Sequence, residues 1–173
     1  MTAVSSWGAT AQERAMPMAC DRLLAGTRVH RATTVDAPAS MVFRWLCQLR
    51  LAPYSYDLVD NLGRRSPREL VPGVERLAVG QRFMVIFSLA SFAYDEHITL
   101  RSHRVAVTYA VLCGEGPTRL VARVVFDPPG GRLGAALIGQ PLALGDLIMM
   151  RKQLLTLKAL AERDGTAQSA QPR

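Results

Sequence analysis

The chain has 173 residues and a mass of 18.9 kDa, and 49% of its residues are hydrophobic. These values are typical of one globular domain and exclude collagen-like, intrinsically disordered and disulfide-scaffold proteins. The net charge is +7, from 21 basic and 14 acidic residues, and nineteen of the basic residues are arginines. Because the arginines are spread along the chain, we interpret the excess as a bias of composition, with one local concentration between Arg64 and Arg82.

The cysteines and the hydropathy pattern indicate in which cellular compartment the protein is expected to lie. Cys20, Cys47 and Cys113 form no CxxC pair, so free thiols in a reducing environment fit them best. The N-terminus lacks the apolar core of a signal peptide. The longest uncharged run, Leu133 to Gly145, has 13 residues, whereas a membrane-spanning helix needs roughly 17 to 25. We therefore expect a soluble cytoplasmic protein without stable membrane insertion.

The chain divides into one domain with two flanking segments. Residues 1–26 show no periodicity that would bury a face, and we expect a flexible N-terminal arm. Residues 27–164 form the domain, and the small polar residues 165–173 are expected to fray.

The domain opens with a β-branched strand, Val29 to Val35, and the turn Asp36-Ala37-Pro38 then places proline at the start of a helix. A short second helix is expected from Tyr54 to Leu62, followed by a loop rich in Arg, Pro and Gly. The apolar face of the first helix comprises Met41, Val42, Trp45, Leu46 and Leu49.

A period of two then predicts an antiparallel meander. Gly114, Gly116 and Pro117 mark one of its turns. The expected strands are Gln81 to Phe87, Phe92 to Arg101, Val105 to Leu112 and Arg119 to Phe126.

The period returns to 3.6 near the C-terminus and predicts a long amphipathic helix. Lys152, Thr156 and Arg163 lie on its polar side. These elements predict an α+β fold in which a curved antiparallel sheet wraps around the C-terminal helix and can leave a cavity beneath it. The apolar stripe of this helix comprises Leu147, Met150, Leu154, Leu157 and Ala161.

Several short motifs resemble a known superfamily. Val35-Asp36-Ala37-Pro38 before the Trp45 helix is similar to the opening of START-like, helix-grip proteins, which include polyketide cyclase/dehydrase and lipid-transport proteins. Tyr54-Ser55-Tyr56-Asp57 with Asp60 to Pro67 resembles a bacterial polyketide cyclase-like branch. Thr118 to Val121 and Met149-Met150-Arg151 are also similar to it. The resemblance spans about residues 28–163 and implies an apolar pocket under the long helix; fold carries over better than function.

Motifs for catalysis or cofactor binding are absent from the sequence: there is no GxSxG, HExxH, Walker loop or GxGxxG. His30, His97 and His103 have no ligand cluster at metal spacing, so neither a metal nor a cofactor is expected. Cys47 beside an apolar stripe is interpreted as a buried, inert thiol.

One carboxylate is unusual. If Phe92 to Arg101 is a single strand, alternation puts Glu96 on the apolar, concave side between Tyr94 and Ile98. A buried carboxylate must be paired, protonated or bound to a ligand. Glu96 is therefore either a polar anchor in the pocket or, by a bulge or a position at the mouth, in water.

Tyrosines supply the other candidate ligand contacts. The hydroxyls of Tyr54 and Tyr56 either line the pocket entrance or belong to packed rings, while Asp57 fits a helix cap. Tyr109 can enter the cavity, with Met150 and Leu154 forming its lid. The complete candidate ligand-binding set is Tyr54, Tyr56, Tyr94, Glu96, Tyr109, Met150 and Leu154.

Arg119 and Arg123 alternate with apolar residues, which places them on the convex side, expected to face solvent. No aromatic residues are interleaved with the arginine cluster, which argues against nucleic-acid binding.

The function best supported by these patterns is binding of an apolar or amphipathic small molecule, such as a lipid, sterol or polyketide, in an internal pocket. The first alternative is a polyketide aromatase/cyclase-type enzyme, for which no catalytic motif is visible. The second is an Arg-rich surface module that binds an acidic partner or an anionic membrane. The oligomeric state and the ligand stay open.

Overall fold

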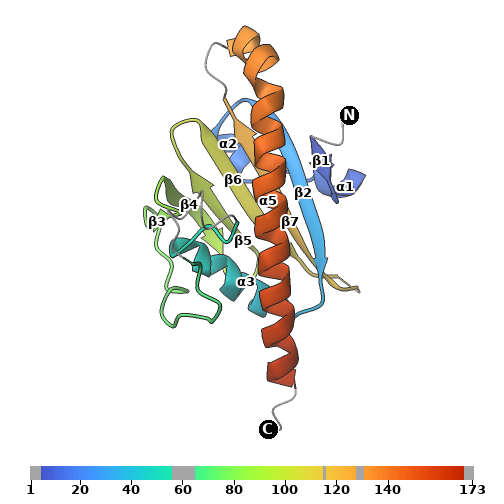
Figure 1. Ribbon diagram of the computed structural model, residues 1–173, viewed down its shortest axis with the longest axis vertical. Helices are drawn as coiled ribbons and strands as arrows, with labels where there is room; N and C mark the ends of the chain where they lie inside the picture. The colour runs from blue at the N-terminus through green and yellow to red at the C-terminus, as the bar shows by residue number, and fades with distance from the viewer. Residues whose placement is uncertain (1–4, 56–64, 115, 128–130, 170–173) are drawn as a thin grey trace.

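The computed structural model of the chain describes residues 5–55, 65–114, 116–127 and 131–169, and for residues 131–147 it describes the backbone only. A seven-stranded sheet carries the long helix α5 across one face (Figure 1). In chain order the elements are β1 (Ser6–Trp7), α1 (Ala11–Ala15), α2 (Cys20–Leu23), β2 (Thr27–Val35), α3 (Ala39–Cys47), the 3₁₀ helix η1 (Gln48–Arg50), β3 (Arg82–Phe83), β4 (Phe87–Ala93), β5 (His97–Arg101), β6 (Val105–Leu112), β7 (Thr118–Phe126) and α5 (Gly131–Ser169).

The strands lie in the order β1-β2-β7-β6-β5-β4-β3, and every pair except β1–β2 is antiparallel. We call the side covered by α5 the helix face and the opposite side the outer face. Side chains of β6 alternate between the two faces. Val107 and Tyr109 belong to the core of the helix face, and Ala106 and Ala110 belong to the core of the outer face. The meander expected from the period of two is confirmed.

The expected strand from Phe92 to Arg101 is wrong, because β4 and β5 are joined by the turn Tyr94-Asp95-Glu96. Asp95 has a φ of 60°, a conformation that aspartate tolerates better than most residues. Phe92 pairs with Ile98 across this hairpin. Because Phe92 and Ile98 are an even number of positions apart, both fit the same alternating pattern. The turn between them therefore cannot be recognised from the alternation.

The expected strand from Gln81 to Phe87 is also a hairpin. β3 ends at Phe83, the turn comprises Met84, Val85 and Ile86, and β4 starts at Phe87, which pairs with Phe83. The two hairpins lie at the edge of the sheet opposite β1 (Figure 1).

The helix expected after Pro38 is confirmed as α3, and its apolar face, including Trp45, is buried in the core of the helix face. The indole Nε1 of Trp45 donates to Asp164 of α5 at 3.1 Å, which ties the two helices together. The short helix expected from Tyr54 to Leu62 lies mostly outside the described residues, as do Tyr56 and Asp57.

α5 extends well beyond the predicted stripe at both ends. The predicted apolar residues Met150, Leu154, Leu157 and Ala161 are buried against the sheet and α3. The tail expected to fray from residue 165 is helical through Ser169. Gly165 is buried where α5 passes the start of α3, and a Cβ there would lie 3.2 Å from that of Ala37. Glycine thus permits the close approach.

The N-terminal segment, expected to be a flexible arm, packs against the sheet instead. β1 adds to the edge beside β2, and the segment around α2 covers the outer face of β5, β6 and β7. Arg119 and Arg123, which were expected to face solvent, bind this N-terminal segment to the sheet. Arg123 is buried and donates to Asp21 and to the carbonyls of Glu13 and Arg14. Sequence periodicity missed this because ion pairs and a few irregularly spaced apolar side chains, such as Met18 and Cys20, mediate the packing, rather than a continuous amphipathic face.

The two apolar layers enclose the sheet on both faces, with the larger one beneath α5. The α+β, helix-grip architecture that the resemblance to START-like proteins implies is confirmed at the level of the fold. Within the described residues no helix has both the length and the apolarity needed to cross a lipid bilayer.

Candidate functional site

The candidate site is the centre of the helix face, where register aligns one residue from each of five strands. Arg31 of β2 pairs with Ala122 of β7, and Ala122 pairs with Tyr109 of β6. Ile98 and Phe92 complete the row. Neighbouring strands are about 4.8 Å apart, so the small Ala122 separates a guanidinium from a phenol. This row brings a guanidinium and a phenol into a mainly apolar layer.

Arg31 is fully buried, and it is not among the residues predicted from the sequence to line a site. Its Nη1 donates to the carbonyl of His30 at 2.9 Å. A guanidinium is always charged, and removing it from water is costly unless hydrogen bonds or counter-charge compensate. The signal was present in the sequence, because alternation along β2 places Arg31 on the same face as the buried Val29 and Val35.

Tyr109 links the sheet to the helix above it. Its hydroxyl donates to Gln153 Oε1 at 2.6 Å and lies 3.6 Å from Met150 Sδ. Gln153 Nε2 in turn donates to the carbonyl of Pro53 and lies 3.4 Å from Met84 Sδ. Sequence analysis missed Gln153, whose buried amide lies in α5 between Met150 and Leu154. The chain of hydrogen bonds fixes the ring of Tyr109 in one orientation.

Of the predicted ligand contacts, the structure brings Tyr109 and Met150 into contact and buries Leu154 in the same core. Tyr54 is buried too, with a φ of 57° and its ring edge-on to Trp45 at 5.9 Å. Tyr56 lies outside the described residues. A role of these side chains in ligand binding stays a prediction.

Glu96 and Tyr94 are not in this interior. Glu96 is exposed in the β4–β5 turn, and its backbone N–H donates to the carbonyl of Ala93. Tyr94 is 58% exposed and packs on the outside of Phe43 and Phe92. Of the two alternatives for Glu96, the structure shows the one in water. The inward orientation depended on an unbroken strand and is wrong for the same reason that the strand is.

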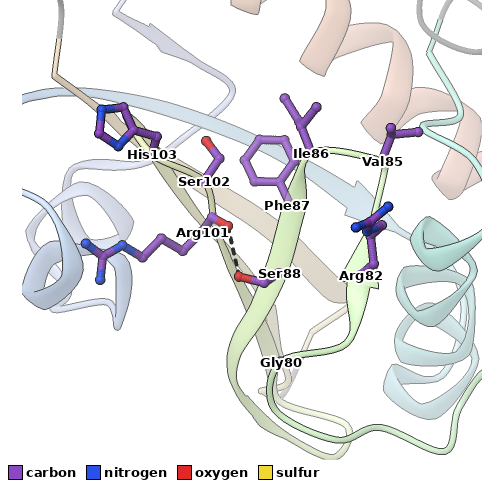
Figure 2. A pocket seen from close by; sticks show the side chains of 9 residues that line it. All are labelled: Gly80, Arg82, Val85, Ile86, Phe87, Ser88, Arg101, Ser102 and His103. Carbon is purple, nitrogen blue, oxygen red and sulfur yellow. Dashed lines mark hydrogen bonds between the residues drawn. The ribbon is translucent and has the colours of Figure 1, made fainter.

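Among the open cavities lined by described residues are two that no described residue of α5 lines. The first, of about 440 Å³, lies at the β3–β4 hairpin (Figure 2). The second, of about 420 Å³, lies between the N-terminal segment and the outer face, and Glu96, His97 and Cys113 are among its lining residues. Glu96 therefore does border a cavity, but on the face opposite to the expected one.

Burial favours the neutral forms of three groups near the sheet, Cys20, Cys47 and His30. Burial raises the pKa of the Cys47 thiol to about 12, so this thiol is a poor nucleophile, as the sequence predicted. Burial also raises the pKa of Cys20. Burial, and after it the positive charges of Arg123, Arg14 and Arg31, lower the pKa of His30 to about 4. Within the described residues, His, Cys, Asp and Glu form no group of three or more with metal-binding geometry.

Comparisons with known proteins find similar folds only among solved structures. MLL2253 from Mesorhizobium loti is 17% identical with a TM-score of 0.49, covering 79% of this chain and 97% of that one. The polyketide cyclase-like protein Cgl2372 from Corynebacterium glutamicum is 14% identical with a TM-score of 0.47, covering 84% and 97%. The di-domain aromatase/cyclase StfQ of steffimycin biosynthesis is 13% identical with a TM-score of 0.49, covering 80% and 51%.

No family model matches the chain, and no curated protein matches it. At these identities the similarities concern the fold alone. The fold assignment itself rests on the strand order and on the position of α5 across the sheet.

Proposed function

We propose that the protein binds an amphipathic small molecule between the helix face and α5, with Arg31 and Tyr109 orienting an oxygen-bearing group of the ligand. The observation that carries this proposal is the pair of fully buried polar side chains on either side of Ala122 in an apolar layer. Small-molecule sites in proteins combine apolar walls with a few well-placed polar groups.

The chemistry of Arg31 favours an acidic or strongly polarised oxygen. A guanidinium presents a planar fork of donors that matches a carboxylate, a phosphate or an enolate. Tyr109 can donate to the same ligand only by giving up its bond to Gln153, so ligand binding would release the hydrogen-bonded chain that ties α5 to the sheet. Ile98, Leu100 and Val107 supply the apolar walls.

Native mass spectrometry of the purified protein, followed by extraction and identification of any bound molecule, tests the proposal. We expect a co-purifying amphipathic acid or carbonyl compound. Arg31→Met keeps the length and apolar stem of the side chain, and it should reduce occupancy about tenfold or more, since hydrogen bonds to charged groups contribute about 1.5–3 kcal/mol. Glu96→Gln is the matched control, because Glu96 lies in an exposed turn. Equal occupancy in the wild type and in folded Arg31→Met would refute the proposal.

An aromatase/cyclase-type enzyme is the second candidate, because the same two side chains could stabilise negative charge that develops on a polyketide enolate. Incubation with a linear poly-β-ketone analogue and mass analysis of the products separates the candidates. Cyclisation with loss of water, slowed in Tyr109→Phe, supports the enzyme, whereas recovery of unchanged analogue supports binding alone.

A further inference from the structure

The turn between β3 and β4 presents two large apolar side chains to solvent. Val85 is 75% exposed and Ile86 is 70% exposed. The backbone at this turn is unusual, because Met84 and Val85 have φ values of 42° and 67° and the N–H of Ile86 donates to the carbonyl of Met84 at 2.7 Å. This is a γ-turn of the rare, strained kind, with a β-branched residue at its centre. Strain of this kind persists where surrounding structure enforces it, often at functional sites.

Contacts of Met84 with the core hold this turn in its strained conformation. The N–H of Met84 donates to the carbonyl of Leu49, in η1, at 3.1 Å. Met84 Sδ lies 3.4 Å from Gln153 Nε2 of α5. Met84 thus anchors the turn to the core, while Val85 and Ile86 project from it (Figure 2). The turn is a fixed apolar tip.

A row of polar and basic side chains lies directly beside this tip. Arg82 pairs with Ser88, and Ser88 pairs with Arg101, so the three side chains share the outer face of adjacent strands. They line the cavity of about 440 Å³, together with Gly80, Val85, Ile86, Phe87, Ser102 and His103. None of these lining residues is acidic. Within the described part of the chain neither Arg82 nor Arg101 pairs with a carboxylate.

We propose that this end of the sheet docks on an anionic membrane, with the cavity holding a lipid phosphate and the tip, Val85 and Ile86, entering the apolar layer below the head groups. Arg82 and Arg101 lie on the same sheet face, two strands apart, and their side chains extend away from each other in Figure 2. Both are exposed, so each can turn toward a phosphate held between them. An apolar tip next to unpaired cations is the combination that binds the interface of an anionic bilayer. The net charge of +7 adds long-range attraction to the same surface.

The apolar tip distinguishes this proposal from binding of a soluble anion. A free phosphate or carboxylate needs the arginines but gains little from two aliphatic side chains that border the cavity and are mostly exposed to solvent. A bilayer uses both features, because each apolar side chain that leaves water contributes favourably to the free energy of binding.

Co-sedimentation of the full chain with vesicles tests the proposal. One set contains phosphatidylcholine alone, and the other contains equal parts of phosphatidylcholine and phosphatidylglycerol. We expect partitioning only to the anionic set and a loss of binding as salt is added. Arg82→Gln with Arg101→Gln should lower the partition coefficient about tenfold or more, while Arg22→Gln, an exposed arginine of α2, should leave it nearly unchanged.

The tip is tested by Val85→Gly with Ile86→Ser. Glycine accepts the positive φ, so this variant should be no less stable than the wild type while its partition coefficient falls about tenfold or more. Leu155→Ser, an exposed apolar residue of α5, is the matched control. Equal binding to both vesicle sets, or unchanged binding of the tip variant, overturns the proposal. Inorganic phosphate that binds the wild type and the tip variant alike, without vesicle partitioning, would identify a soluble-anion site instead.

This proposal does not depend on the internal ligand site. Arg31→Met should partition to anionic vesicles like the wild type, because Arg31 lies on the helix face and does not line the cavity. Failure of either proposal can therefore be recognised separately.

Discussion

Glu13 of α1 and Arg119 of β7 are 106 residues apart in the chain, yet two nitrogens of the guanidinium donate to both carboxylate oxygens at 2.8 and 2.9 Å. Arg119 also donates to the carbonyl of Gly8 and to the hydroxyl of Thr34. Burial raises the pKa of Glu13, but hydrogen bonds from Arg119 and Thr10 outweigh it, so the pKa is lowered overall. The N-terminal segment is therefore attached by charged groups to the middle of the sheet.

We expect Glu13→Gln to lower the free energy of unfolding by about 1–3 kcal/mol, because it leaves the partly buried charge of Arg119 without a counter-charge. Chemical denaturation monitored by circular dichroism measures this value. The control is Arg104→Gln, whose pair with Asp127 is about half exposed on both sides and should contribute less than about 1 kcal/mol. The effect should shrink in acid, as Glu13 becomes protonated. Equal effects of the two substitutions would contradict the structural role of Glu13.

Removing residues 1–24 tests the packing of the whole segment. The truncation uncovers an apolar patch that includes Val121 and Val125 and leaves Arg123 without its bonds to Asp21, Glu13 and Arg14. We expect a lower melting temperature and increased binding of a hydrophobic dye. A truncated protein with an unchanged melting temperature would instead support a flexible arm.

Tyr109→Phe should lower the free energy of unfolding by about 1–3 kcal/mol, because the buried Oε1 of Gln153 loses its donor. Tyr94→Phe is the matched control, since Tyr94 is mostly exposed and its hydroxyl lies 3.4 Å from the carbonyl of Glu75. Its substitution should change stability by less than about 0.5 kcal/mol. Thermal and chemical unfolding of both variants provide the measurement.

His30 should make the protein less stable between about pH 6.5 and pH 4. Its pKa is lowered from 6.5 to about 4 in the folded state, so over this interval the unfolded chain binds a proton that the folded chain does not. Stability is unaffected above this interval and falls as the pH drops through it, by up to about 3 kcal/mol. His30→Gln should show a smaller loss between these pH values than the wild type. Parallel pH profiles would show that His30 makes no such contribution.

The three thiols should differ sharply in reactivity. Cys113 is exposed, whereas Cys20 and Cys47 are buried and have raised pKa values. A thiol reagent at neutral pH should therefore label one cysteine rapidly in the folded protein and all three after unfolding. Mass spectrometry of the labelled peptides identifies the site, and rapid labelling of Cys47 in the folded state would be inconsistent with its burial.

The sequence alone predicted most of the framework, because that framework depends on local periodicity. Strands β6 and β7, helix α3 and the apolar stripe of α5 all follow from alternation or from helical spacing of apolar residues. Tyr109 was placed beneath α5, and Met150 and Leu154 on the face of α5 that covers it, for the same reason. Such patterns require only that one side of an element is buried.

Tertiary structure alone decided the features that depend on pairing between distant segments. Register placed Ala122 between Arg31 and Tyr109, which no local pattern encodes. The β4–β5 hairpin places Glu96 in an exposed turn. The alternation of residues with a period of two continues across this turn, so the sequence pattern does not reveal it. The N-terminal segment packs through ion pairs and through a few irregularly spaced apolar residues, so its partners on β7 could be identified only from the assembled sheet.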